Sequence, residues 1–290
     1  MSKVNTRIPL QGGYANEIWK VRHDNQWLIE KNYRIPVGTP NPMYPNLPDH
    51  EARVLAHLSG TGIAPEFVSY TAARGRSLAQ VTYTFVVGTT WAKGVSDVAQ
   101  LLSKVHRVTP PKGIRRLHNS ATRARQHGDT MIANVRSPQA TELRTLRPSH
   151  AAGPSHAPLS LVHTDCGPGN LLRTRTGLVL IDWQCPGIGD PVEDLACFLS
   201  PAMMILYNCA PHSFLTSEKF LDSYPDANVV KRYRRDAASW HYRIAAYCIW
   251  RVKSLARSAP LVSSTYQRAA AAEQPALSRC SASASQHHSS

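Results

Sequence analysis

The hydrophobic and polar positions of residues 1–88 follow the pattern of short strands around one helix. Three apolar runs within residues 7–34 are separated by Gly, Asp and Asn turn residues, which predicts a small antiparallel sheet. A proline-rich connection follows, and Asp49 can then cap a helix whose apolar residues share one face. A second β-rich run, residues 81–87, ends at Gly88. We therefore predict an N-terminal domain over residues 1–88.

From residue 89 onward the apolar positions recur mainly with helical spacing. Helices are expected at residues 98–106, 120–135 and 194–206, and a short hairpin is expected at 171–181. This pattern predicts a second, mainly helical domain over residues 89–266. Beyond it the chain is rich in Ala and Ser and poor in large apolar groups, so residues 267–290 are expected to form a disordered tail.

The composition is that of an ordinary globular protein. The chain has 290 residues, of which 42% are hydrophobic and 18% charged, so whole-chain disorder and a coiled coil are excluded. The longest apolar stretch, Leu195–Tyr207, is too short to span a bilayer, and the N-terminus has no apolar run like that of a signal peptide. We expect a cytoplasmic protein with no membrane partner. The six cysteines form no C-x-x-C pair, so free thiols are expected.

The net charge of +14 makes an anionic partner worth considering. Residues 89–150 hold 11 basic and 3 acidic side chains, but few aromatic residues lie between them. A solvated basic surface is therefore favoured over a nucleic-acid site, which would need stacking rings as well as charge. Residues 165–194 differ in charge from the basic segment 89–150, because five carboxylates are concentrated there. A cation site is expected in that segment.

The most informative motif is His163-x-Asp165-x-x-x-x-Asn170, followed by the hairpin and by an apolar strand that ends at Asp182. Phosphoryl transfer from a nucleotide needs these residue types, because the reaction depends on positioning and on charge neutralisation. One carboxylate must meet the incoming hydroxyl, and Asp165 suits that role. An amide oxygen and a second carboxylate must hold Mg²⁺, and Asn170 and Asp182 suit that role. The alternative is that all three are turn and strand-end residues.

These motifs resemble those of the aminoglycoside phosphotransferase and choline kinase-like family, over roughly residues 8 to 255. The resemblance implies an α+β class and a two-lobed protein kinase-like fold. It also implies that Asp165 is the catalytic base and that Asn170 and Asp182 bind magnesium. Thr164 departs from the family pattern, which more often has glycine there.

The same resemblance assigns nucleotide contacts to the N-terminal domain. The candidates are Gly12, Gly13, Lys31, Glu51, Val86 and Gly88. The two adjacent glycines match the phosphate-covering loop, Lys31 matches the lysine that contacts the α- and β-phosphates, and Glu51 matches its ion-pair partner. Val86 and Gly88 lie in the segment that corresponds to the adenine-binding hinge. Lys20 is an alternative to Lys31 for the phosphate contact.

The hypothesis is an enzyme that moves the γ-phosphoryl group of ATP to a small-molecule hydroxyl with Mg²⁺. An amino alcohol, a sugar or a related metabolite is the expected acceptor. An aminoglycoside is less favoured, since the segment expected to bind the acceptor is more basic than acidic. A stripe containing Trp240 and Tyr247 is either core or a cation-binding surface. The alternative function is a kinase-like protein that binds a nucleotide or another anion without catalysis; nucleic acid is not an expected partner.

Overall fold

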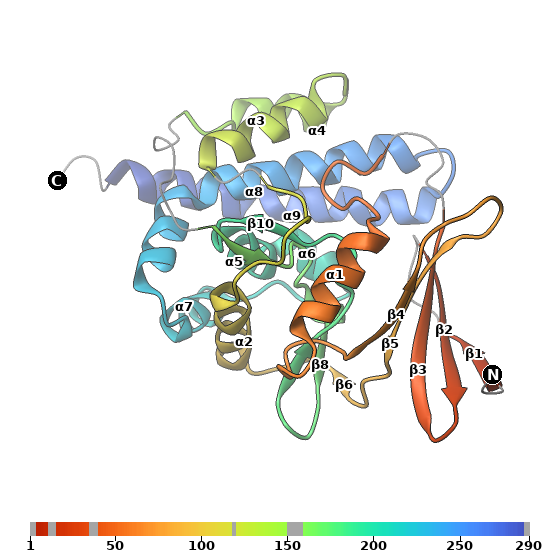
Figure 1. Ribbon diagram of the computed structural model, residues 1–290. Coiled ribbons are helices and arrows are strands. Elements are labelled where there is room, and N and C mark those ends of the chain that lie inside the picture. Colours follow the sequence, from red (N-terminus) through yellow and green to blue (C-terminus); the bar gives the residue numbers. More distant parts are fainter. Residues whose placement is uncertain (1–3, 11–15, 35–39, 118–119, 150–158, 287–290) are drawn as a thin grey trace.

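A small antiparallel sheet lies beside a larger helical part (Figure 1). The structure is a computed structural model that describes residues 4–10, 16–34, 40–117, 120–149 and 159–286. Gly12 and Gly13 therefore lie outside the described residues. The sheet and the helices agree with the predicted α+β class.

The sheet has the strand order β1-β2-β3-β5-β4, and all neighbouring strands are antiparallel. Its strands are β1 (Val4–Pro9), β2 (Asn16–His23), β3 (Gln26–Tyr33), β4 (Phe67–Thr71) and β5 (Ala79–Thr84). Because side chains alternate between the two faces of a strand, Ile29, Lys31 and Tyr33 share one face of β3, and all three are buried. The lysine thus projects from the sheet into the interior.

Helix α1 (Pro48–Leu58) packs against β4 and β5. The fixed backbone angle of Pro48 suits the first helical position. The expectation that Asp49 caps this helix is wrong, because Leu47 holds the cap position and Asp49 lies within the first turn. The buried face of α1 carries Ala52, Val54, Leu55 and Leu58 together with one acid, Glu51.

The helical part is built from α2 (Val95–Arg107), α3 (Ala121–Ile132), α4 (Pro138–Thr145), α5 (Val192–Leu199), α6 (Pro201–Leu206), α7 (Phe214–Ser223), α8 (Ala227–Leu255) and α9 (Pro260–Gln286). The helix predicted over 194–206 is two helices. Ser200 ends α5, and its hydroxyl accepts a hydrogen bond from Met203 N at the start of α6. Pro201 occupies the first position of α6, where its missing N–H is tolerated. The change from sheet to helices falls between β5 and α2, and the domain boundary at Gly88 stays a prediction.

Residues 267–286 of the expected disordered tail are instead helix, since α9 continues to Gln286 and packs along α8 (Figure 1), and residues 287–290 lie outside the described residues. Ala269, Ala270 and Leu277 are buried in this contact. Alanine has the strongest helix preference, and its small side chain lets two helices approach closely. Glu273 is fully buried and accepts hydrogen bonds from Ser200 Oγ and from Ala202 N at the start of α6. Composition suggested disorder because it does not reveal the partner helix.

Short strands place the predicted catalytic segment. They are β6 (Thr89–Thr90), β7 (Ser160–Val162), β8 (Leu171–Arg173), β9 (Leu178–Leu180) and β10 (Gly187–Gly189), with a 3₁₀ turn at Pro168–Asn170. The predicted hairpin is confirmed, as β8 and β9 pair with Leu171 opposite Leu180. The segment from His163 to Asn170 thus runs from β7 to β8, and Asp182 follows β9.

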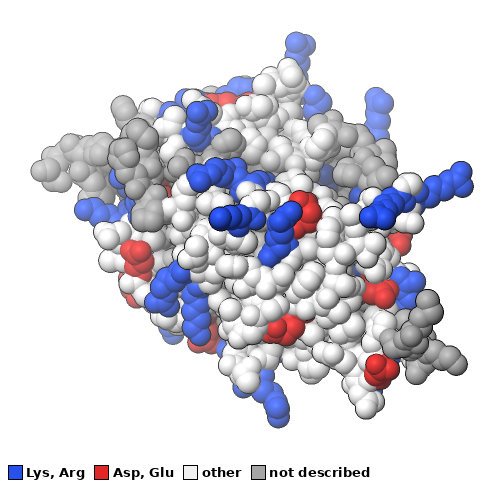
Figure 2. Space-filling model, viewed as in Figure 1, with Lys and Arg blue, Asp and Glu red and all other residues white. Residues whose placement is uncertain are grey.

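Lys and Arg side chains are distributed over the face seen in Figure 2, with a few acidic side chains between them. Several of them have partners within the chain. Arg125 donates to Pro148 O, Arg144 donates to Ile132 O, and Arg147 pairs with Asp129. These contacts support the interpretation of segment 89–150 as a solvated, structural surface. None of the helices in the described ranges combines the length and hydrophobicity needed to cross a bilayer.

Candidate active site

A buried ion pair connects β3 to α1. Lys31 Nζ lies 2.9 Å from Glu51 Oε2, and both side chains are 1% exposed. Burial alone would lower the pKa of Lys31, but the carboxylates of Asp182 and Glu51 outweigh it and raise that pKa. Lys31 is therefore charged at neutral pH, and the predicted pairing with Glu51 is present.

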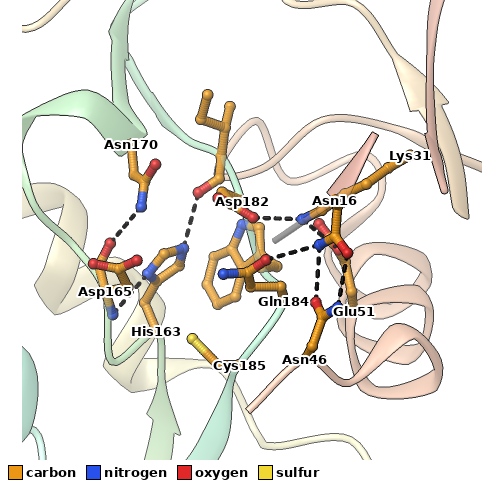
Figure 3. Close-up of polar contacts among 12 residues, drawn as sticks. Asn16, Lys31, Asn46, Glu51, His163, Asp165, Asn170, Asp182, Gln184 and Cys185 are labelled. Atoms are coloured by element: carbon orange, nitrogen blue, oxygen red, sulfur yellow. Dashed lines mark hydrogen bonds and ion pairs between the residues drawn. The ribbon is translucent and has the colours of Figure 1, made fainter. Parts of the chain in front are cut away.

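Asp182 brings a second carboxylate to the same lysine. Its Oδ1 lies 2.5 Å from Lys31 Nζ. The residue follows β9 with a φ of +61°, a left-handed conformation that Asp adopts more readily than most residues. Its side chain is 30% exposed, in contrast to Lys31 and Glu51. Asp182 therefore stands at the accessible edge of the charged cluster (Figure 3).

Lys20, the alternative phosphate-binding lysine, lies in a different environment. Its ammonium group rests 3.8 Å from the ring centre of Phe85 and 4.6 Å from that of Trp27. Such cation–π contacts hold it against aromatic side chains. Of the two lysines, Lys31 is the one joined to Asp182 and Glu51.

Asp194 on α5 holds the start of the segment that carries Asp165. Its two carboxylate oxygens accept the main-chain N–H groups of His163 at 2.9 Å and Thr164 at 2.7 Å. His106 on α2 binds the same carboxylate at 3.0 Å. Burial would raise the pKa of Asp194, but the hydrogen bond and charge of His106 lower it below its usual range. One fully buried carboxylate thus connects α2, α5 and the catalytic segment.

His163 acts as a structural group. Its Nδ1 accepts the N–H of Asp165 at 3.2 Å, so Nε2 carries the proton and donates to Ile181 O at 3.0 Å. Burial lowers the pKa of His163, which keeps the ring neutral. The ring also packs edge-on against Trp183, with 4.5 Å between the ring centres. His163 therefore ties the segment before Asp165 to the strand that leads to Asp182.

Thr164 occupies a backbone conformation that favours glycine, with a φ of +73°. A β-branched residue in the left-handed region is strained by roughly 1–2 kcal/mol. The side chain offsets part of this strain, because Oγ1 donates to Cys185 O at 2.9 Å. This explains how the chain accommodates threonine at a position where glycine was expected.

Asp165, the predicted base, accepts a hydrogen bond at Oδ1 from the hydroxyl of Tyr207 at 2.9 Å. Burial, followed by the nearby charge of Asp182, raises the pKa of Asp165 to about 7. The group is therefore poised near neutral pH, which suits a proton acceptor.

Asn170 is oriented by its amide nitrogen. Nδ2 donates to Asp165 O at 2.8 Å and to the hydroxyl of Tyr207 at 2.9 Å. Both amide hydrogens are thus used, and Oδ1 accepts from no described residue. The carboxylate oxygen Oδ2 of Asp182 likewise has no described donor. These two oxygens fit a hard divalent cation such as Mg²⁺.

Within the described ranges, no group of three or more His, Cys, Asp or Glu side chains could hold an ion. This fits Mg²⁺, which is bound by one or two side chains and otherwise keeps waters and substrate phosphates as ligands.

Three side-chain amides form a second connection between the sheet and the catalytic part. Asn16 at the start of β2 donates to Asn46 at 2.8 Å and to Gln184 at 3.1 Å. Gln184 lies two residues after Asp182, and its main-chain oxygen accepts the N–H of Leu47 at 3.1 Å. This network fixes the start of β2 beside Asp182 (Figure 3).

Val86 and Gly88 lie in the connection between β5 and β6. The connection begins with a hydrogen bond from Phe85 N to Trp27 O at 2.9 Å. A Cβ on Gly88 would lie 2.7 Å from Arg173 O, so the close approach of β8 requires glycine there. Their assignment to an adenine-binding hinge stays a prediction.

Figure 3 shows how the structure joins the predicted residues: Asp165 and Asn170 lie on one side of Asp182, and Lys31 and Glu51 lie on the other. Tyr207 and the amide network were not predicted from the sequence, and Asp194 belonged to the carboxylate-rich segment 165–194 without a role of its own. Asp194 has a sequence signal, as one of two adjacent acids, with Glu193, at the start of an otherwise apolar helix. Tyr207 has none, because it ends an apolar run 37 residues after Asn170.

The sequence of residues 6–228 matches the model of the phosphotransferase enzyme family (APH). In a separate sequence comparison, no curated protein matches the chain.

Solved structures share its protein kinase-like fold. A candidate aminoglycoside phosphotransferase from Ralstonia eutropha is 15% identical with a TM-score of 0.70, over 99% of this chain and 94% of that one. Spectinomycin phosphotransferase APH(9)-Ia, in complex with ADP and spectinomycin, is 13% identical with a TM-score of 0.64, over 94% of each chain. A choline/ethanolamine kinase family protein from Mesorhizobium loti is 16% identical with a TM-score of 0.62, over 97% of this chain and 92% of that one.

The TM-scores establish the fold, and the predicted protein kinase-like architecture is thereby confirmed. The family match covers well over half of the sequence. The chain therefore belongs to the phosphotransferase enzyme family.

Proposed function

We propose that this protein is a small-molecule kinase that transfers the γ-phosphoryl group of ATP to a hydroxyl group. The observation that carries the proposal is the convergence of Lys31, Glu51 and Asp182 beside Asp165 and Asn170. Membership of the phosphotransferase family and the ADP complex of a structural neighbour support it.

Lys31 is held between two carboxylates and is 1% exposed. A phosphate oxygen of the nucleotide can replace Asp182 as the partner of Lys31, while the bond to Glu51 keeps the lysine in place. That exchange frees Asp182 Oδ1. Binding of the nucleotide and release of Asp182 for the metal ion are thus coupled through the ammonium group of Lys31.

Mg²⁺ would be held by the amide oxygen Oδ1 of Asn170 and by the carboxylate oxygen Oδ2 of Asp182. When bound, the ion supplies neutralisation of the charge on the phosphate oxygens. Asn170 is prepared for this role, because its two amide hydrogens are already bonded to Asp165 O and to Tyr207. The amide oxygen cannot turn inward without breaking both bonds.

Asp165 would accept the proton of the incoming hydroxyl at Oδ2, since Oδ1 is bonded to Tyr207. The raised pKa of about 7 makes this carboxylate a stronger base than an exposed aspartate. Asp194 and His163 fix the main chain on either side of Thr164 and so fix the position of this base.

The acceptor is proposed to be an amino alcohol, a sugar or a related hydroxylated metabolite. The stripe expected to be either core or a cation-binding surface is core: Trp240 is 1% exposed and Tyr247 is 2% exposed. A polycationic aminoglycoside is not favoured, because the charge of helix α8 is predominantly basic.

The test is ADP formation by the purified chain with MgATP and a panel of hydroxylated metabolites. At least one acceptor should accelerate ADP formation, and mass spectrometry should find the phosphorylated product. Asp165→Asn should lower transfer by about 10²–10⁴-fold, the usual contribution of a general base, while MgADP still raises the melting temperature.

Two outcomes would contradict the proposal. Transfer by Asp165→Asn at the wild-type rate would remove the assigned base. MgADP binding without ATP turnover on any acceptor would favour the alternative function, a nucleotide-binding protein without catalysis.

A further inference from the structure

The ring of Tyr207 fills a slot made by two glycines of the catalytic segment. A Cβ on Gly169 would lie 2.5 Å from Tyr207 Cδ1, and a Cβ on Gly167 would collide with the same ring. Neither glycine has a positive φ, so their backbones would accept alanine. It is the ring, and not the backbone conformation, that excludes a side chain at both positions.

The position of this ring is fixed from the helical part. Tyr207 ends α6, and its N–H bonds Met203 O and Met204 O at 3.2 Å. The other end of α6 is held by the buried carboxylate of Glu273, which accepts from Ala202 N at 2.8 Å. A short helix anchored at both ends thus presents the tyrosine to the catalytic segment.

The hydroxyl of Tyr207 contacts both functional groups of this segment. It has one proton, which it donates to Asp165 Oδ1 at 2.9 Å, and it accepts a hydrogen from Asn170 Nδ2 at 2.9 Å. The first bond leaves Asp165 Oδ2 as the oxygen available to an acceptor hydroxyl. The second leaves Asn170 Oδ1 as the oxygen available to a metal ion.

We propose that Tyr207 is a positioning residue that selects, through one hydroxyl, which oxygen of Asp165 and which oxygen of Asn170 face the reaction. The inference rests on the proposed function and adds to it a residue from outside the family motif. The hydroxyl performs no chemistry itself, and it acts by orienting two side chains that do.

The test compares Tyr207→Phe, which keeps the ring in its slot and removes only the hydroxyl, with Tyr44→Phe. Tyr44 is a matched control, because its hydroxyl donates to Met203 Sδ at 3.5 Å instead of to Asp165. Two measurements are made: Mn²⁺ affinity in the presence of ADP, by electron paramagnetic resonance, and the steady-state kinetics (kcat and KM) of ATP hydrolysis without an acceptor.

Tyr207→Phe should weaken Mn²⁺ binding and lower kcat by about tenfold each, as expected for a group that orients a metal ligand, with KM for ATP within about twofold of wild type. Tyr44→Phe should leave both quantities within about twofold of wild type. Unchanged Mn²⁺ affinity in Tyr207→Phe would overturn the inference, and so would a kcat that stays the same or rises. A rise would mean that the hydroxyl blocks the acceptor position.

The metal measurement separates this inference from the proposed function. If wild type neither hydrolyses ATP nor phosphorylates any acceptor of the panel, the kinase proposal fails, while the difference in Mn²⁺ affinity still tests the role of Tyr207.

Gly169→Ala gives an independent test, because its Cβ should push the ring from the slot. Its loss of Mn²⁺ affinity should match that of Tyr207→Phe. The double variant Gly169→Ala with Tyr207→Phe should bind Mn²⁺ no more weakly than either single variant. Additive losses would contradict a shared cause.

Discussion

The two halves of the candidate site are held by different forces. Lys31, Glu51 and Asp182 form a charged half, in which one buried cation joins two carboxylates. The hydrogen-bonded half contains Asp165, Asn170 and Tyr207. In it, the Tyr207 hydroxyl donates to the carboxylate of Asp165, and the Asn170 amide donates to Asp165 O and to the Tyr207 hydroxyl. Charge acts over several ångströms, whereas a hydrogen bond requires a narrow range of distance and angle.

This difference predicts different failures. Removing a charge from the charged half should lower both the free energy of unfolding and ATP turnover, because a group of opposite charge loses its partner. Removing the hydroxyl from the second half should change orientation and turnover with little effect on stability.

The largest effect is expected for Lys31→Met. Burial already raises the pKa of Glu51 to about 7, and loss of the ammonium raises it further. At pH 7 Glu51 must then take up a proton or stay charged without a partner, so the free energy of unfolding should fall by about 3 kcal/mol. ATP turnover should fall by about a hundredfold or more, because the contact to the phosphates is lost. Urea unfolding and steady-state kinetics measure the two effects.

The double variant Lys31→Met with Glu51→Gln is the matched control. Neutralising Glu51 removes the uncompensated buried charge, so most of the lost stability should return while turnover stays low. The stability difference between the single and double variants should widen from pH 7 to pH 9, because deprotonation of the buried Glu51 destabilises the single variant. Equal stability at both pH values would show that charge does not hold this half together.

The charged half could be predicted from the sequence, whereas much of the hydrogen-bonded half could not. Lys31, Glu51 and Asp182 are charged residues placed on a strand, on a helix and at a strand end, where apolar neighbours make them conspicuous. Asp165 and Asn170 share one short motif. Tyr207 meets them only because α6 folds against Gly167 and Gly169, and this packing leaves no spacing pattern in the chain.

The C-terminal segment shows the same limit of sequence patterns. Its Ala- and Ser-rich composition resembles a disordered tail, yet Glu273 is bonded to His241 of α8 as well as to the start of α6. A single acid among small residues is the only sequence signal of this contact. Local composition describes what a segment can do alone, and a partner helix changes that outcome.

Asp194→Asn should have the next largest effect. The substitution removes a charged acceptor of the N–H groups of His163 and Thr164, so the free energy of unfolding at pH 7 should fall by about 2 kcal/mol. Because the pKa of Asp194 is lowered in the folded state, its contribution is present above the unfolded pKa of about 3.9 and is lost as the pH falls through the lower folded value.

The stability difference between wild type and Asp194→Asn should therefore narrow when urea unfolding is measured at pH 3 instead of pH 7. Asp97→Asn is the control, since this acid is 55% exposed and pairs with Arg173 at the surface. Its effect should stay below about 1 kcal/mol at both pH values. A stability difference between wild type and Asp194→Asn that is as large at pH 3 as at pH 7 would contradict the lowered pKa of Asp194.

The smallest effect is expected at Thr164, where backbone strain and a hydrogen bond oppose each other within the hydrogen-bonded half. Thr164→Gly relieves a left-handed strain of about 1 kcal/mol and removes a hydrogen bond of similar size, so the net change in unfolding free energy should stay below about 1 kcal/mol. Thr164→Val keeps the branched side chain and the strain but leaves Cys185 O without this donor, so it should be destabilised by about 1–2 kcal/mol. Glycine should therefore be the better-tolerated replacement in thermal unfolding. A greater loss for glycine than for valine would mean that the buried methyl group of Thr164, and not its hydroxyl, stabilises this turn.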